Sequence, residues 1–169
     1  MKKIPILSVV GTSNSGKTTL IEKVIQDLKR KGYRIAIIKH SHKDFEIDRP
    51  GKDTYRHGQA GADIVVLSSP YKVAIMETVQ EERDLEKIVQ SITEVDLILT
   101  EGYKKGNQKK IEVHRACLGR GIITPMEELL AVASDDSLDL TVPLLHIDDI
   151  EGITQIIEQF INEKQQKSC

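Results

Sequence analysis

Short apolar runs alternate with stretches of helical periodicity along most of this 169-residue chain. Six runs have the length of a β-strand, and they cover residues 4–10, 33–40, 95–102, 110–115, 129–134 and 142–147. Apolar positions recur every three to four residues over 18–31, which predicts an amphipathic helix, and 81–92 and 151–164 predict two more. Strands that alternate with helices predict an α/β fold, a mostly parallel sheet with helices on both faces.

The segment after the second strand departs from this alternation. Residues 41–62 are polar and contain Pro50-Gly51, which predicts a long loop with at most one helical turn. The apolar runs 63–69 and 72–78 flank Pro70-Tyr71 and predict an antiparallel hairpin. Because no linker or shift in composition separates these parts, we expect one domain over residues 1–169.

Composition removes several classes of function. With 24 Lys and Arg against 26 Asp and Glu, the net charge of -2 lacks the basic excess of a protein that follows a phosphate backbone, so we expect no nucleic-acid partner. Ser8 and Gly11 interrupt the first apolar run well before the length of a signal peptide or a membrane span, so no membrane partner is expected. Cys117 and Cys169, the only cysteines, are too few for a disulfide framework or a zinc knuckle, so we expect inert thiols and a cytoplasmic protein.

A glycine-rich octet joins the first strand to the first helix. It matches the pattern G-x-x-x-x-G-K-[ST] and comprises Gly11, Thr12, Ser13, Asn14, Ser15, Gly16, Lys17 and Thr18. Its glycines let successive backbone N–H groups point at one anion, and the positive end of the following helix adds to that field. We therefore interpret the octet as a phosphate-binding loop, in which Lys17 reaches the β- and γ-phosphates and Thr18 coordinates Mg²⁺.

Magnesium in such a site needs a carboxylate from outside the loop, because Mg²⁺ prefers oxygen ligands. The run 95–102 offers Asp96 at its start and Glu101 near its end. Ligands of an open parallel sheet lie beyond the carboxyl ends of its strands, which favours Glu101 and leaves Asp96 as a turn residue. We expect Thr18 and Glu101 to hold the metal, and Lys17 and Glu101 to be the catalytic residues.

Two further clusters are less specific. Lys39, His40 and His42 lie at the end of the second strand, where the histidines would either bind a metal or line an anion site. Asp53 follows a Pro-Gly turn and would either reach the same cleft or only stabilise the turn. The run 104–110 holds four lysines on a predicted loop, which is either a solvated turn or a surface that attracts an anionic substrate or an acidic partner.

Together these segments resemble the molybdopterin-guanine dinucleotide biosynthesis protein B family over nearly the whole chain. The resemblance is carried by GTSNSGKTTL, IKHSHKDFEIDRPGKDTYRHGQAGA, DLILTEGYK, KIEVHR and AVASD. One departure is Lys43, which stands where the motif often has a second consecutive histidine. The resemblance implies the three-layer fold of P-loop NTPases, phosphate contacts from Gly11 to Thr19, and a cleft lined by Lys39, His40, His42 and Asp53.

The same resemblance implies a GTP-binding accessory protein of molybdenum cofactor biosynthesis with weak GTPase activity. It implies Mg²⁺ as cofactor and a molybdopterin guanylyltransferase-type enzyme as partner, and it leaves open whether molybdopterin itself binds. No N-K-x-D guanine signature is present, so the choice of GTP over ATP rests on the resemblance. Asp135 follows the run 129–134, where its carboxylate would either accept hydrogen bonds from guanine or serve in a plain turn.

Two other functions are compatible with the loop alone. A small-molecule kinase or ATP-dependent ligase would use the same loop and would need a substrate pocket formed by residues 41–62. A nucleotide-dependent adaptor without turnover would use the phosphate site only to order a partner surface.

The hairpin also predicts how the chain assembles. Ile64, Val65, Val66 and Leu67 are consecutive apolar residues, so both faces of that strand are expected to be covered. An uncovered apolar edge invites pairing, and a two-fold dimer closes it for identical chains. Because the resembled family is also dimeric, we expect a homodimer with residues 63–78 at or beside the interface.

Overall fold

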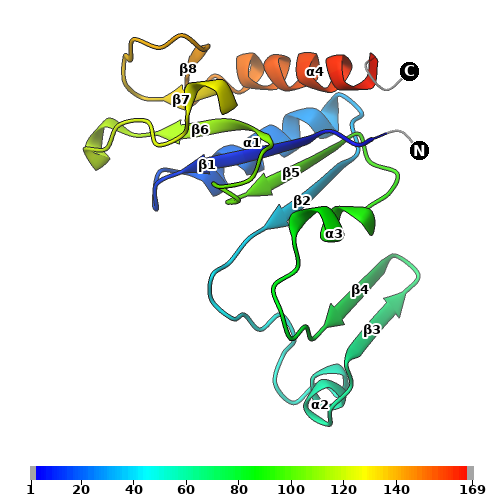
Figure 1. Ribbon diagram of the computed structural model, residues 1–169. Coiled ribbons are helices and arrows are strands. Elements are labelled where there is room, and N and C mark those ends of the chain that lie inside the picture. Colours follow the sequence, from blue (N-terminus) through cyan, green and yellow to red (C-terminus); the bar gives the residue numbers. More distant parts are fainter. Residues whose placement is uncertain (1–2, 167–169) are drawn as a thin grey trace. The chain divides into compact units, whose positions relative to one another are not determined.

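The structure is a computed structural model that describes residues 3–166. The chain divides into two compact units, the first formed by the residues up to 40 and from 92 onward, the second by residues 41–91. Figure 1 draws the second unit in cyan to green. The single domain expected over residues 1–169 stays a prediction.

The first unit is built on a six-stranded sheet in the order β2-β5-β1-β6-β7-β8, in which neighbouring strands are all parallel (Figure 1). All six predicted strands are confirmed, with ends shifted by a few residues. Parallel strands place their carboxyl ends at one edge of the sheet, where ligands of such folds bind. The strands are β1 (Ile6–Gly11), β2 (Ile35–Lys39), β5 (Leu97–Glu101), β6 (Lys109–His114), β7 (Leu129–Ser134) and β8 (Leu144–His146).

Two helices of the first unit, α1 (Lys17–Arg30) and α4 (Ile150–Gln166), pack against each other and against the sheet (Figure 1). Every second residue of a strand points to the same face, so one apolar set from each central strand meets the apolar stripes of both helices. Each fully buried Leu or Ile side chain stabilises the fold by about 2 kcal/mol relative to exposure. This core includes Leu7, Val9, Leu20, Val24, Leu28, Leu97, Leu99, Ile111, Val113, Ile153, Ile157 and Ile161.

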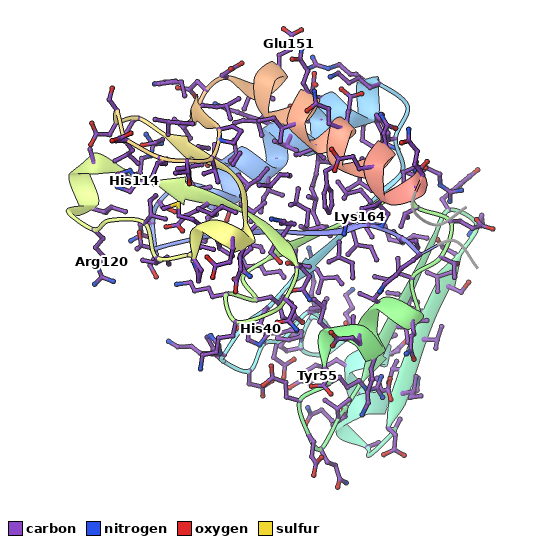
Figure 2. All side chains as sticks on the ribbon, turned by 45° about the horizontal axis from the view of Figure 1, so that its top comes forward. His40, Tyr55, His114, Arg120, Glu151 and Lys164 are labelled. Carbon is purple, nitrogen blue, oxygen red and sulfur yellow. The ribbon has the colours of Figure 1, made fainter. Side chains whose placement is uncertain are left out.

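The opposite face of β6 is polar and nevertheless buried. The Glu112 carboxylate accepts hydrogen bonds from the backbone N–H groups of Ile123 and Thr124, both at 2.9 Å. The His114 ring contacts the Arg120 carbonyl oxygen at 2.9 Å, and Figure 2 labels both residues. Buried polar groups need such partners. These hydrogen bonds hold residues 120–124 against this face of β6.

The lysine run 104–110 differs from the predicted loop. Lys109 and Lys110 begin β6, and the Lys110 side chain is completely buried. Its ammonium pairs with the Glu128 carboxylate and donates to the Gly106 carbonyl oxygen. A buried charge is tolerated only when it is paired in this way. Lys110 therefore serves the fold, and it belongs neither to a solvated turn nor to a surface that attracts an anion.

The second unit contains a hairpin and two short helices. They are α2 (Asp53–Gln59), β3 (Ile64–Ser69), β4 (Lys72–Glu77) and α3 (Leu85–Gln90). The antiparallel hairpin is confirmed, and it forms a two-stranded sheet of its own instead of extending the parallel one. A two-residue connection closes the pair at Ser69 and Lys72, so the strands satisfy each other locally.

The hairpin is far less covered in the single chain than the sequence predicts. Ile64, Val66 and Leu67 are 54%, 55% and 55% exposed. The helix α2 contacts β3 but has only seven residues, so it leaves most of the hairpin uncovered. The expectation that both faces are covered is therefore not met within one chain.

No helix within residues 3–166 is long and apolar enough to cross a membrane. The Cys117 thiol is free and exposed. Cys169 lies outside the described residues, so its expected inertness stays a prediction.

Candidate functional site

The loop between β1 and α1 depends on two glycines. Gly11 has φ +143°, and a Cβ at this position would lie 2.4 Å from the Val113 carbonyl oxygen on the neighbouring strand. Gly16 caps α1 in the left-handed region at φ +91°. Asn14 also has a positive φ of 62°, which asparagine tolerates better than most residues. The consensus glycines are therefore what lets the chain turn tightly from strand to helix.

Lys17 opens α1 and reaches back across the loop. Its ammonium donates to the Thr12 carbonyl oxygen at 2.6 Å. Burial lowers the pKa of Lys17, the Glu101 carboxylate opposes this shift, and the positive charges of Lys104 and Lys39 lower the pKa further. The three lysine ammonium groups repel one another, so an anion bound among them would be stabilised.

Thr18 and Glu101 come together at the carboxyl edge of the sheet. The Thr18 hydroxyl donates to Glu101 Oε1 at 2.9 Å. Lys39 lies level with Glu101 in the pairing of β2 with β5, and its ammonium is 3.4 Å from Glu101 Oε2. The ends of β2 and β5 and the start of α1 thus place a hydroxyl, a carboxylate and an ammonium at one point.

This donor set fits a magnesium ion. Hydroxyl and carboxylate oxygens are the ligands that Mg²⁺ prefers, and it is usually held by one or two carboxylates together with substrate phosphates. Within residues 3–166, no group of three or more His, Cys, Asp and Glu side chains could hold a metal on its own. Asp96 precedes β5, and its carboxylate accepts a hydrogen bond from the Arg34 backbone N–H at 2.8 Å, as expected of a turn residue.

The histidine cluster is divided between the two units. The backbone N–H of His40, which Figure 2 labels, donates to the Glu101 carbonyl oxygen at 3.0 Å. The His40 ring centroid is 4.8 Å from that of Tyr103. His42 and Asp53 belong to the second unit. The Asp53 side chain is 88% exposed and lies 3.8 Å from the Arg56 guanidinium. The structure brings Lys39 and His40 to Glu101, and a cleft role for His42 and Asp53 stays a prediction.

Asp135 follows β7, and both of its carboxylate oxygens are engaged. Oδ1 accepts from the Ala116 backbone N–H at 3.0 Å, and Oδ2 accepts from the Arg115 guanidinium at 3.1 Å. These two hydrogen bonds, the backbone one first, hold the pKa of Asp135 below its ordinary value. Its proposed contact with guanine stays a prediction.

Arg115 is the residue that the sequence analysis missed. Its Nε donates to the Ser15 carbonyl oxygen of the loop at 3.3 Å. The available signal was its position directly after the strand β6, since that strand was expected to end at the ligand edge of the sheet.

The parallel sheet, the loop at the carboxyl end of β1 and the following helix define a P-loop α/β protein of the nucleotide-binding class. The chain belongs to the MobB family, because the family model described as Molybdopterin guanine dinucleotide synthesis protein B matches residues 6–135. The resemblance predicted from the sequence is thereby confirmed.

Individual relatives agree with this assignment. The chain is 36% identical over 162 residues to the molybdopterin-guanine dinucleotide biosynthesis adapter protein of Haemophilus influenzae, covering 95% of this chain and 91% of the relative. It is also 36% identical over 170 residues to the Escherichia coli protein of the same name, covering 95% of each. A crystal structure of molybdopterin-guanine biosynthesis protein B aligns with a TM-score of 0.70 and 32% identity, covering 91% of this chain and 98% of the other.

Proposed function

We propose that this chain is a GTP-binding adapter protein of molybdopterin-guanine dinucleotide biosynthesis with weak GTPase activity. The adapter role follows the names of its relatives. The nucleotide role is carried by one observation, the convergence of Lys17, Thr18 and Glu101 at the carboxyl edge of the sheet. GTP is chosen over ATP on the family resemblance. A molybdopterin guanylyltransferase-type enzyme is the proposed partner, in the cytoplasm.

Each residue has a defined part in this proposal. Lys17 exchanges the Thr12 carbonyl oxygen for the β- and γ-phosphates, which it binds as a point charge. The loop N–H groups and the positive end of α1 bind the remaining phosphate oxygens. Thr18 and Glu101 would hold Mg²⁺, which when bound neutralises charge on the phosphates. The Glu101 carboxylate also orients the attacking water. Hydrolysis is slow in this proposal because Glu101 is the one residue assigned to that water.

Side-by-side titration calorimetry with GTP and ATP, with and without Mg²⁺, tests the proposal. Lys17→Ala should weaken GTP binding about a hundredfold, because a charge-assisted contact to phosphate is lost. Lys29→Ala, at the far end of the same helix, is the matched control and should bind as wild type does. Equal affinities for GTP and ATP would reject the guanine preference, and unchanged GTP affinity in a folded Lys17→Ala variant would reject the site.

One observation favours a second candidate, a small-molecule kinase or ATP-dependent ligase. The second unit contains an open hollow of about 780 Å³, lined mostly by residues of the segments 44–48, 54–62 and 75–79. One of these residues is Tyr55, which Figure 2 labels. That volume is in the range of small-molecule sites. Mass spectrometry for phosphorylated or ligated products would identify such an enzyme. Single-turnover assays that detect no hydrolysis would instead identify an adaptor without turnover.

We further propose a homodimer formed through the hairpin. The register pairs Val66 with Ile75 and Ser68 with Val73, so the three apolar residues share one face. Val66, Ile75 and Val73 are each more than half exposed in the single chain. A contiguous apolar face of this kind is stabilised when a second copy covers it.

A further inference from the structure

Arg115 contacts two elements of the first unit at once. Its Nε donates to the Ser15 carbonyl oxygen in the loop at 3.3 Å, and its Nη1 donates to Asp135 Oδ2 after β7 at 3.1 Å. Its Nη2 lies 3.5 Å from the position that a Cβ of Gly16 would take. One guanidinium therefore spans the distance between the loop and the end of β7.

Asp135 fixes the orientation of that guanidinium. Its second oxygen accepts from the Ala116 backbone N–H at 3.0 Å, which prevents the carboxylate from rotating freely. The Arg115 and Asp135 side chains are 35% and 29% exposed, so the pair is partly shielded from water. A planar guanidinium makes these two contacts through different nitrogens, whereas a lysine ammonium is a point donor without this fork.

The loop itself holds Ser15 weakly. Ser15 is completely buried, and its hydroxyl has no hydrogen-bond partner among the residues that the structure describes. The hydrogen bond from its backbone N–H to the Thr12 carbonyl oxygen is long, at 3.4 Å. The contact from Arg115 thus reaches the loop at a residue whose own hydrogen bonding within the loop is weak.

We propose that Arg115, oriented by Asp135, is a positioning residue of the loop. It holds the Ser15 carbonyl group so that residues 11–18 keep their anion-binding shape before any nucleotide arrives. The inference rests on the proposed function for the identity of the anion. It gives Asp135 a role in supporting the loop, which differs from reading the guanine base.

A supporting role and a base-reading role predict different ligand dependence. A loop that keeps its shape binds phosphate groups whatever is attached to them, so loss of Arg115 should weaken inorganic tripolyphosphate and GTP alike. A residue that reads the base would affect GTP and leave tripolyphosphate unchanged, because tripolyphosphate carries no base.

The experiment compares Arg115→Lys, Arg115→Gln and Asp135→Asn with the wild-type chain. Arg34→Lys is the matched control, because Arg34 forms an exposed ion pair with Glu94. Arg34 directly precedes β2 and so lies at the amino ends of the strands, away from the loop. Hydrogen exchange is measured without ligand in peptides covering 11–19 and, as an internal reference, in 150–161. Titration calorimetry then gives the affinities for tripolyphosphate and GTP.

We expect about tenfold faster exchange in the loop, unchanged exchange in 150–161, and about tenfold weaker binding of both ligands in the three variants. The control should behave as wild type. Unchanged loop exchange overturns the inference, as does an equal increase in 150–161, which would show general destabilisation. Weaker GTP with unchanged tripolyphosphate overturns it in favour of base reading. A wild-type chain that binds neither ligand refutes the proposed function alone, because the exchange measurement still decides the role of Arg115.

Discussion

Glu101 is the residue on which the proposed chemistry depends most. It accepts a hydrogen bond from Thr18 and lies 3.4 Å from the Lys39 ammonium, although its side chain is only 14% exposed. A carboxylate so placed can serve a metal ion and an attacking water at the same time. In the proposed function the nucleotide can be held without it, since the phosphate contacts are assigned to the loop and Lys17.

The first prediction follows for Glu101→Gln. The amide keeps the size of the side chain and an oxygen that can accept from Thr18, but it removes the negative charge. Hydrolysis of GTP should fall about a hundredfold, while GTP affinity changes much less. Single-turnover assays across a Mg²⁺ titration measure this, with Asp96→Asn as the control. The same Mg²⁺ dependence as in wild type would show that Glu101 is not near the metal.

The second prediction concerns Gly11→Ala. The added Cβ would collide with the Val113 carbonyl oxygen, and neither strand can yield without breaking the pairing of β1 with β6. We expect a loss of about 2 kcal/mol in the free energy of unfolding. Urea denaturation measures it. Gly121→Ala, where an added Cβ meets nothing within 4 Å, should change stability little.

Among the elements, α1 and α4 are joined by hydrogen bonds as well as by their apolar stripes. The hydroxyl of the buried Thr154 donates to Asp27 Oδ2 at 2.8 Å, and the Lys31 ammonium donates to Glu158 Oε2 at 2.7 Å. The bond from Thr154 lowers the pKa of Asp27, and the bond to Glu158 raises the pKa of Lys31. The contact between these helices is therefore linked to pH at both extremes.

The third prediction is the sign of that linkage. The folded pKa of Asp27 lies below its ordinary value of 3.8, so its stabilisation is complete above pH 3.8 and is lost as the pH falls through the folded pKa. The folded pKa of Lys31 lies above 10.5, so its stabilisation is complete below pH 10.5 and is lost as the pH rises through the folded pKa.

Denaturation series over pH test both limbs. Thr154→Val should flatten the dependence of the free energy of unfolding on pH below 3.8 and leave the alkaline limb in place. Lys31→Met should remove the loss of stability that wild type shows as the pH rises above 10.5. An acid limb of unchanged slope in Thr154→Val would show that its hydroxyl does not set the pKa of Asp27.

For the whole molecule, the exposed hairpin makes assembly the property to measure. The fourth prediction is that wild-type protein at micromolar concentration is a dimer by light scattering, and that Val66→Glu and Ile75→Lys yield the 19.0 kDa monomer. Burial of a charge on an apolar interface opposes association. Ile123→Glu is the matched control, since Ile123 is an exposed apolar residue of the first unit. A wild-type monomer would contradict the dimer, and dimeric hairpin variants would place the interface elsewhere.

The sequence by itself determined the features that depend on neighbouring residues. The strands and helices follow from local periodicity, and the loop follows from eight consecutive residues whose glycines are required by the backbone. Glu101 could be selected because the end of a parallel strand is a ligand edge whatever the order of the strands. The same rule predicts that Thr18 and Glu101 converge, and in the structure the Thr18 hydroxyl lies 2.9 Å from Glu101 Oε1.

Only the tertiary structure decided which distant residues meet. Arg115 and Ser15 are 100 positions apart, and their contact exists because β6 is the neighbour of β1, an order that no local pattern specifies. Lys110 looks like a surface lysine in its sequence, but it is buried because Glu128 reaches it from another segment. The hairpin forms its own sheet because its strands pair with each other. Burial, register and long-range hydrogen bonds depend on the whole packed chain, and local sequence does not encode them one residue at a time.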